Sequence, residues 1–232
     1  MIHHIIKRLV TLTLLLAITL PLYSQNARAD KGFLDLCKKI TKAFAAQDVK
    51  TINTYIHPKK GLYIFYSPGA QTSYLKISSL PLDCFKNETF ALLVNIKKEY
   101  HTISGQIPYD VITPDKINSL KYGITKFDCD SYWSPYGAFV DTTTKVTILS
   151  EVIKFRIKDY EDHPSSYNVP RKELQARIET DKKELIKARG VEKKSRRVVF
   201  SSKDGNDFIF YMTLIGNKWY LSMIDFSNSC DA

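Results

Sequence analysis

The sequence predicts an α+β fold in a single domain, and three patterns along the chain indicate it. Close to the start, apolar residues recur with helical spacing, which is typical of an amphipathic helix followed by a shorter one. Close to the end, apolar and polar residues alternate around two turns that contain glycine, which predicts three antiparallel strands. A charged segment with helical spacing comes just before those strands. We therefore expect two N-terminal helices packed on an antiparallel sheet, a closing C-terminal three-stranded meander, and an additional charged helix before it.

Residues 1–29 have the three parts of a secretory signal peptide. Basic residues precede the apolar run Leu9 to Leu20, and Ala27-Arg28-Ala29 forms a cleavage site of small residues. The apolar run is too short to cross a bilayer, and no later stretch is both long and uncharged enough to do so. We therefore expect residues 30–232 to form an exported domain with a helical elaboration around 147–190 and no membrane span. Its expected location is the periplasm or the outside of the cell.

The chain is basic, with a formal net charge of +10, and much of the excess is concentrated at residues 182–197. Such a run can bind polyanions weakly, or it can be the solvated end of a helix. Nucleic acid is not expected as a partner, because an exported protein rarely meets it and no aromatic residue interrupts the run. The candidate polyanion contacts are Lys193, Lys194, Arg196 and Arg197.

The sequence contains four cysteines, Cys37, Cys84, Cys129 and Cys230. Export to an oxidising compartment makes all four candidates for disulfides, and three full pairings are open. Their spacing matches no zinc or redox motif. Cys37 also lies on the apolar face of the first predicted helix, so a buried free thiol is the alternative there.

The N-terminal part predicts two helices and two strands. The first helix is expected over Asp30 to Gln47, and Asp48 can cap a second helix over 49–56. Pro58 ends that helix, because the residue before a proline disfavours the helical conformation. A strand is expected over 62–66, followed by a turn and a partner strand around 74–77.

These elements resemble one known group of proteins. The two N-terminal helices, the strand from Gly61 to Tyr66, and the hairpin from Gly216 to Leu221 followed by Ile224-Asp225 are similar to the nuclear-transport-factor-2-like (cystatin-like) superfamily. More narrowly, the chain resembles exported members of that superfamily from Gram-negative bacteria. The resemblance implies a curved sheet that wraps around helices to form a cone with a pocket. It implies no particular activity, because that fold hosts enzymes, binding modules and accessory domains.

The middle of the chain gives weaker signals. The run Ala91 to Ile96 fits a helix or a strand. The segment from Phe127 to Gly137 is an aromatic, turn-rich loop, and its side chains Tyr132, Trp133 and Tyr136 are candidate ligand contacts. Farther on, helical spacing begins at Leu149, and Pro170 can start the charged helix that runs to Gly190.

The last hairpin predicts the binding site. Gly216-Asn217 favours a type II′ turn, which sets the facing pairs of the two strands. One face is then wholly apolar: Phe210, Met212, Leu214, Trp219, Leu221 and Met223. The other face is mixed, with Tyr211, Tyr220 and Ser222 among Ile209 and Ile224. We expect Tyr211, Tyr220 and Ser222 to bind a ligand in a pocket between the N-terminal helices and this mixed face. Alternatively, the mixed face is solvated and the aromatic loop forms a protein-contact surface.

No motif for a catalytic site, a metal or a cofactor occurs in the sequence. The favoured interpretation is a non-enzymatic exported binding or interaction module. The alternative is a small hydrolase or isomerase that uses a pocket carboxylate, Asp225 or Asp128, with His57 or His101 as its partner. Enzymes of the resembled superfamily carry acids that project into the pocket, as Asp225 would.

Overall fold

The computed structural model of the chain describes residues 32–68, 71–86, 89–96, 99–128, 132–141 and 145–227. At residues 86, 89, 92–96, 99–106 and 132 only the backbone is described. An N-terminal helix covers residues 32–45. The helices after it are α2 (Val49–Thr54), α3 (Pro114–Asn118), α4 (Ile148–Asp162) and α5 (Arg171–Glu192), with a 3₁₀ turn at Pro164–Ser166. The strands are β1 (Leu62–Tyr66), β2 (Ser73–Ile77), β3 (Phe85–Lys86), β4 (Thr89–Ile96), β5 (Glu99–Gln106), β6 (Lys121–Gly123), β7 (Lys126–Asp128), β8 (Tyr132–Ser134), β9 (Gly137–Asp141), β10 (Ser195–Ser201), β11 (Asp207–Ile215) and β12 (Lys218–Phe226).

The predicted α+β fold is confirmed. Seven strands form the main sheet in the order β2-β1-β12-β11-β10-β9-β6. The sheet is mostly antiparallel, with two parallel pairs, β1 with β12 and β6 with β9. The C-terminal meander is present as β10, β11 and β12. The ambiguous run 91–96 is part of strand β4, which pairs with β3 and β5 in a separate small sheet.

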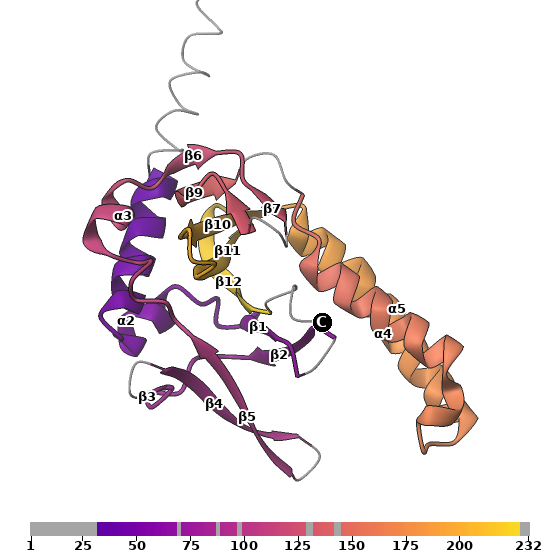
Figure 1. Cartoon of the computed structure of the whole chain (residues 1–232). Coiled ribbons are helices and arrows are strands. Elements are labelled where there is room, and N and C mark those ends of the chain that lie inside the picture. The colour runs from indigo at the N-terminus through magenta and orange to yellow at the C-terminus, as the bar shows by residue number, and fades with distance from the viewer. Residues whose placement is uncertain are drawn as a thin grey trace, which may run out of the picture.

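The sheet buries apolar side chains on both faces, and different helices cover each one. The N-terminal helix covers the face that we call the helix-side face; there Phe44 packs on Phe208 with ring centroids 5.0 Å apart, and Phe33 packs on Trp219 at 4.5 Å. On the opposite face, Leu149 and the neighbouring apolar residues of α4 and α5 pack on the strands. We call this the arm-side face, because α4 and α5 form an antiparallel helical hairpin, the arm, that extends away from the body (Figure 1).

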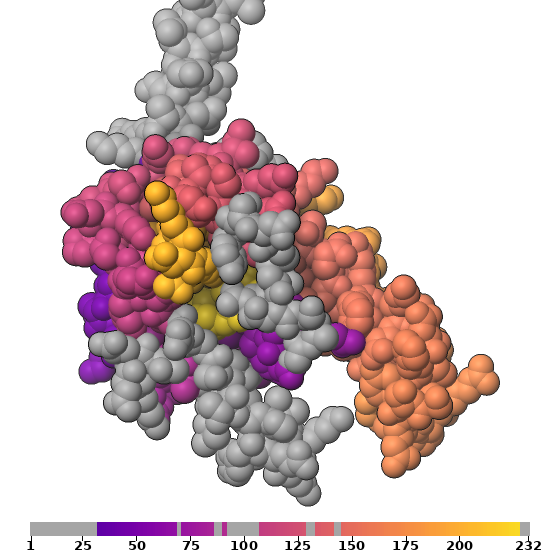
Figure 2. Space-filling model, viewed as in Figure 1, coloured from indigo at the N-terminus to yellow at the C-terminus, as the bar shows by residue number. Residues whose placement is uncertain are grey.

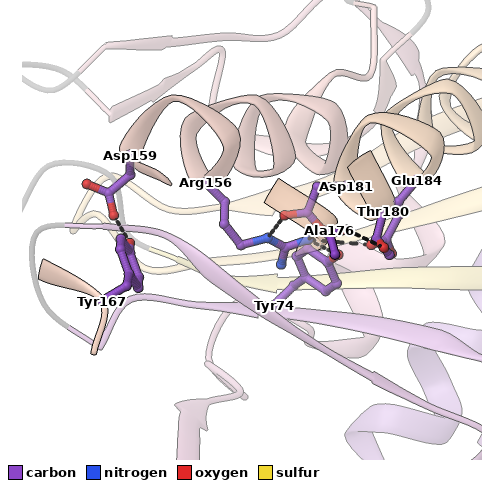
Figure 3. Close-up of polar contacts among 8 residues, drawn as sticks. All are labelled: Tyr74, Arg156, Asp159, Tyr167, Ala176, Thr180, Asp181 and Glu184. Atoms are coloured by element: carbon purple, nitrogen blue, oxygen red, sulfur yellow. Dashed lines mark hydrogen bonds and ion pairs between the residues drawn. The ribbon is translucent and has the colours of Figure 1, made fainter. Parts of the chain in front are cut away.

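Polar contacts hold the arm together where its apolar stripe is narrow. The guanidinium of Arg156 in α4 donates to both carboxylate oxygens of Asp181 in α5, at 2.7 Å each. It also donates to the hydroxyl of Tyr74 in β2 at 3.2 Å, so the same side chain ties both helices to the sheet (Figure 3). At the base of the arm, Glu192 at the end of α5 accepts from the Ser150 amide at 2.8 Å and thereby satisfies the N-terminus of α4. The far end of the arm stands clear of the body (Figure 2).

The predicted register of the last hairpin holds near the turn and changes farther along. Gly216 adopts a φ of 62°, as the first position of a type II′ turn requires, and Leu214 faces Trp219 as expected. Between Tyr211 and Met212 the register shifts, because Ser222 is an extra residue in β12. Its hydroxyl donates to the Tyr211 carbonyl at 3.0 Å and accepts from the Thr213 hydroxyl at 2.6 Å.

Because of this bulge, the residues of β12 after Ser222 lie on the opposite faces from those predicted. Met223, expected on the apolar face, lies on the arm-side face, whereas Ile224, expected on the mixed face, lies in the helix-side core. Asp225 consequently faces Ile209 on the arm side. Without the extra residue, strict alternation would direct Asp225 toward the N-terminal helices.

Two of the four disulfide candidates lie within the described residues. Cys37 and Cys84 are buried free thiols in the helix-side core. Burial raises the pKa of Cys84 to about 11 and that of Cys37 still higher, which disfavours the reactive thiolate. The buried-thiol alternative therefore describes Cys37. Cys129 and Cys230 lie outside the described residues, so a disulfide there stays a prediction.

Candidate functional site

A cavity of about 660 Å³ lies on the arm-side face of the sheet. Its walls come from α4, from the β7–β8 hairpin, from strands β11 and β12, and from residues 71 and 72. We call it the acidic pocket, because two aspartates, Asp207 and Asp225, line it from the sheet.

The walls of the acidic pocket are largely apolar and aromatic. Ile209 covers the sheet side, and Phe155 of α4 stands at the opposite wall with 47% of its surface exposed. Phe127 and Trp133 pack on each other with ring centroids 5.1 Å apart and close one end. An apolar enclosure with a few polar groups is the usual composition of a small-molecule site.

The two aspartates occupy neighbouring strands on the same face. Asp207 and Ile209 are two residues apart in β11, so their side chains share a face, and Ile209 faces Asp225 of β12. Asp207 and Asp225 are therefore diagonal neighbours, a relation in which side chains start about 7–8 Å apart. Trp133 Nε1 donates to Asp207 Oδ2 at 2.8 Å. Asp225 Oδ1 accepts from the amide and hydroxyl of Ser227 at 3.0 and 2.6 Å.

Burial disfavours the charged form of both carboxyl groups. It raises the pKa of Asp207 to about 6, although the Trp133 hydrogen bond lowers it, and the charge of Asp225 raises it further. Burial also raises the pKa of Asp225, although Ser227 opposes the shift. The Tyr211 hydroxyl donates to Asp225 Oδ2 over a long 3.4 Å, and burial raises the pKa of Tyr211 well above its usual range. Asp207 can therefore accept or release a proton close to neutral pH.

Arg197 lines the pocket and pairs with a third aspartate, Asp141. Its guanidinium forms an ion pair with the fully buried carboxylate of Asp141, which also accepts from the Thr125 hydroxyl at 3.0 Å. The same guanidinium lies over the Trp133 ring, 4.6 Å from its centroid. The charge of Arg197 also lowers the pKa of Asp225, but burial has the larger effect and raises it.

The pocket mouth carries charges of both signs. Lys145, Lys154 and Lys158 line it together with Glu151. Lys154 pairs with Glu151 at 2.6 Å, and both side chains are largely exposed. Within the described ranges, no three His, Cys, Asp or Glu side chains gather as metal ligands.

The structure divides the predicted ligand contacts among several places. Tyr211 and Trp133 come together in the acidic pocket. Tyr220 and Ser222 line a second, smaller cavity on the same face of the sheet. Tyr136 is 42% exposed and lines neither cavity, and Tyr132 belongs to β8 with only its backbone described.

The mixed face does carry a pocket, but the wall opposite it differs from the expected one. The N-terminal helix covers the other face of the sheet, where Phe44, Phe208, Phe210 and further apolar side chains fill the space beneath it. The arm, through α4, forms the wall instead. Which helix covers which face depends on long-range packing, for which the sequence offered no signal.

The acid–base candidates are also separated. Asp225 lines the acidic pocket, whereas Asp128 is exposed and lines neither cavity. His57 lines the second cavity, and His101 belongs to β5 with only its backbone described. Sequence reasoning missed Asp207, although its spacing from Ile209 and Tyr211 places all three on one face.

The basic run does not form one surface. Lys193 and Lys194 are exposed after α5. Arg196 turns to the helix-side face, where it lies over the rings of Phe33 and Trp219, 5.0 and 5.1 Å from their centroids. Arg197 turns to the arm-side face, as alternation along β10 requires.

No helix among the described residues is long and apolar enough to cross a membrane. Comparisons with protein-family models, with curated proteins and with solved structures found no match. The function of the chain is therefore inferred from its own residues.

Proposed function

We propose that this chain is an exported, non-enzymatic binding module of the bacterial envelope, and that it takes a small ligand into the acidic pocket. The observation that carries the proposal is the cavity itself, with about 660 Å³ of space, aromatic walls and two partly buried carboxyl groups on the sheet side. Ligand sites in proteins typically span roughly 300–1,000 Å³ and combine apolar walls with a few placed polar groups.

The polar groups indicate the ligand chemistry. Asp207 accepts a hydrogen bond from the indole of Trp133, and an ionised carboxylate can accept several hydrogen bonds. A donor group on a ligand can therefore add to the hydrogen bond from Trp133. We therefore favour an apolar molecule with an amine or hydroxyl group that reaches Asp207 and Asp225.

Truncating Phe155, which the arm contributes to the wall of the acidic pocket, is expected to weaken the binding of an apolar amine. N-phenyl-1-naphthylamine is a suitable probe, because it is fluorescent, mostly apolar and has one N–H donor. Phe155→Ala removes a half-exposed wall residue, and we expect about tenfold weaker binding, which corresponds to roughly 1.4 kcal/mol. The measurement is a fluorescence titration of the folded protein.

The matched control is Ile186→Ala. Ile186 is 71% exposed on α5 and does not line the pocket, so this variant should bind the probe as the unmodified protein does. Equal affinities for all three proteins would refute binding in the acidic pocket.

A second candidate is a small hydrolase or isomerase with a carboxylate acid–base pair. The observation that favours it is the presence of Asp207 and Asp225 in one cavity, both with raised pKa values. Chromogenic 4-nitrophenyl esters and glycosides provide the discriminating assay. Turnover that is lost in both Asp207→Asn and Asp225→Asn, with probe binding retained, would favour the enzyme over the binding module.

Export is the part of the proposal that depends on the sequence alone, since residues 1–29 lie outside the described residues. We expect cleavage after Ala29, because an apolar core followed by Ala27-Arg28-Ala29 is a signal-peptidase pattern. N-terminal sequencing of protein from the cell envelope should then start at Asp30. A sequence that starts at Met1 would contradict export by this route.

The nuclear-transport-factor-2-like relationship likewise remains a proposal. Two helices packed on one face of a mostly antiparallel sheet support it. The space between those helices and the sheet is filled by apolar side chains, so the cavity proposed for binding lies on the opposite face.

A further inference from the structure

A second cavity, of about 220 Å³, lies on the arm-side face at the end of the sheet where β11 turns into β12. Segments far apart in the sequence form it: the turn after α2, strand β2, the end of α5 and the β11–β12 hairpin. Each of the first three contributes a lysine, namely Lys60, Lys76 and Lys194. We call this cavity the lysine pocket.

The charge of the lysine pocket is uncompensated within the part of the chain that the structure describes. None of the described aspartates and glutamates lines it. None of the three lysines forms an ion pair with a described carboxylate, whereas Lys154 and Lys182 on the arm both pair with glutamates. Three ammonium groups around one cavity repel one another, and an anion bound among them would relieve that repulsion.

A neutral donor lies beside the lysines. The Nδ1 atom of His57 accepts from the backbone amides of Lys59 and Lys60 at 3.1 and 3.2 Å. In a neutral imidazole the proton then resides on Nε2, which makes that atom a donor. The ring is held against Tyr220, with ring centroids 4.8 Å apart. Ser222 and Thr213 add hydroxyl groups to the wall, and Val191, Leu214, Ile215 and Leu221 make the rest of it apolar.

We infer that the lysine pocket binds a small tetrahedral oxyanion, a phosphate or sulfate group, between Lys60, Lys76 and Lys194. The cavity has room for such a group together with some of its water, since about 220 Å³ equals the share of roughly seven water molecules in the liquid. Lysine ammonium groups are established binders of phosphate as point charges. This site is separate from the acidic pocket, with which it shares none of its described lining residues, so it stands independently of the proposed function.

The oxyanion can come from solution or from the head group of a lipid, and both sources present the same chemistry. The first experiment titrates inorganic phosphate and sulfate into the full chain and follows the amide chemical shifts by nuclear magnetic resonance. The second experiment compares the fraction of protein that sediments with vesicles of phosphatidylglycerol and with vesicles of phosphatidylcholine.

Charge reversal at Lys194 is expected to weaken binding strongly in whichever experiment detects it. Lys194→Glu places a carboxylate in the cavity, and we expect at least about a tenfold loss of affinity, equivalent to roughly 1.4 kcal/mol. The matched control is Lys193→Glu, which makes the same charge change at an exposed neighbour that does not line the cavity. Its affinity should change by less than about twofold, because exposed charges outside the site are screened.

Salt provides a further check on the same proteins. Affinity should fall severalfold as sodium chloride rises from about 0.1 M to about 1 M, since the Debye length shortens from about 10 Å to about 3 Å. If Lys194→Glu weakens phosphate binding and Lys193→Glu does not, the site binds a soluble oxyanion. If the same pattern is found with vesicles alone, the site binds a lipid head group. The inference would be overturned if neither experiment showed saturable binding, or if the two variants lost affinity equally.

Discussion

Arg197→Met is expected to lower the free energy of unfolding by about 3–5 kcal/mol, because it leaves the carboxylate of Asp141 buried without its cation. The Asp141 side chain has no exposed surface and the Arg197 side chain only 16%. The Thr125 hydroxyl would remain as a donor, but one neutral hydrogen bond does not replace a buried ion pair. Chemical denaturation monitored by circular dichroism measures the change.

The neighbouring residue is the natural control. Arg196→Met also removes a guanidinium from β10, but that group lies over aromatic rings on the other face and should cost about 1–2 kcal/mol. Adding Asp141→Asn to Arg197→Met should restore much of the lost stability, since the unpaired charge is then removed. If Arg197→Met is no more destabilising than Arg196→Met, the pair with Asp141 does not have this role.

Asp207→Asn is expected to stabilise the protein above pH 6 and to have little effect near pH 4. The folded protein holds the Asp207 proton more tightly than the unfolded chain does, since burial raises its pKa from 3.8 to about 6. The unmodified protein therefore loses stability as pH rises through this window, whereas an asparagine does not titrate. The shift of about two units corresponds to roughly 3 kcal/mol, an upper bound because solvent in the pocket screens the charge.

Denaturation curves at several pH values between 4 and 8 test this prediction. Asparagine keeps a carbonyl oxygen that can accept from Trp133, so the hydrogen bond at 2.8 Å can persist. The control is Asp204→Asn, which neutralises an exposed aspartate in the preceding turn and should leave the pH dependence unchanged. A difference between Asp207→Asn and the unmodified protein that does not vary with pH would contradict the burial of this charge.

A carboxyl group that lowers stability at neutral pH is typical of a functional site. Proteins tolerate such costs where binding or catalysis needs the group. Asp207→Asn should therefore make the protein more stable while weakening its hold on the naphthylamine probe. A gain in stability together with a loss of probe affinity would link Asp207 directly to the proposed binding function.

The sequence predicted those parts of the fold that local signals specify. The Asp48 cap, the apolar spacing around Phe33 and Phe44, and the glycine at 216 each act within a few residues, and the structure has the corresponding helices and turn. The bulge at Ser222 was not predictable in this way. It depends on a hydroxyl that bonds across to the Tyr211 carbonyl, and the alternation in the sequence continues through it without interruption.

The candidate site was only partly predictable for the same reason. Tyr211 and Trp133 were recognised because aromatic hydroxyl and indole groups suit a pocket. Asp207 was not singled out, because it follows a predicted turn without any motif, and the wall around Phe155 comes from an arm whose docking depends on long-range packing. Lys194 was grouped with its neighbours in sequence, whereas in space it lies with Lys60 and Lys76.

The two sides of the sheet can be observed separately by intrinsic fluorescence. The chain has two tryptophans, and they lie on opposite sides of the sheet. Trp133 donates its indole N–H to Asp207, so its emission is sensitive to the state of the acidic pocket. Trp219 packs against Phe33 and senses the core beneath the N-terminal helix. Unlabelled protein with either tryptophan replaced by phenylalanine therefore carries a spectroscopic reporter for a single face.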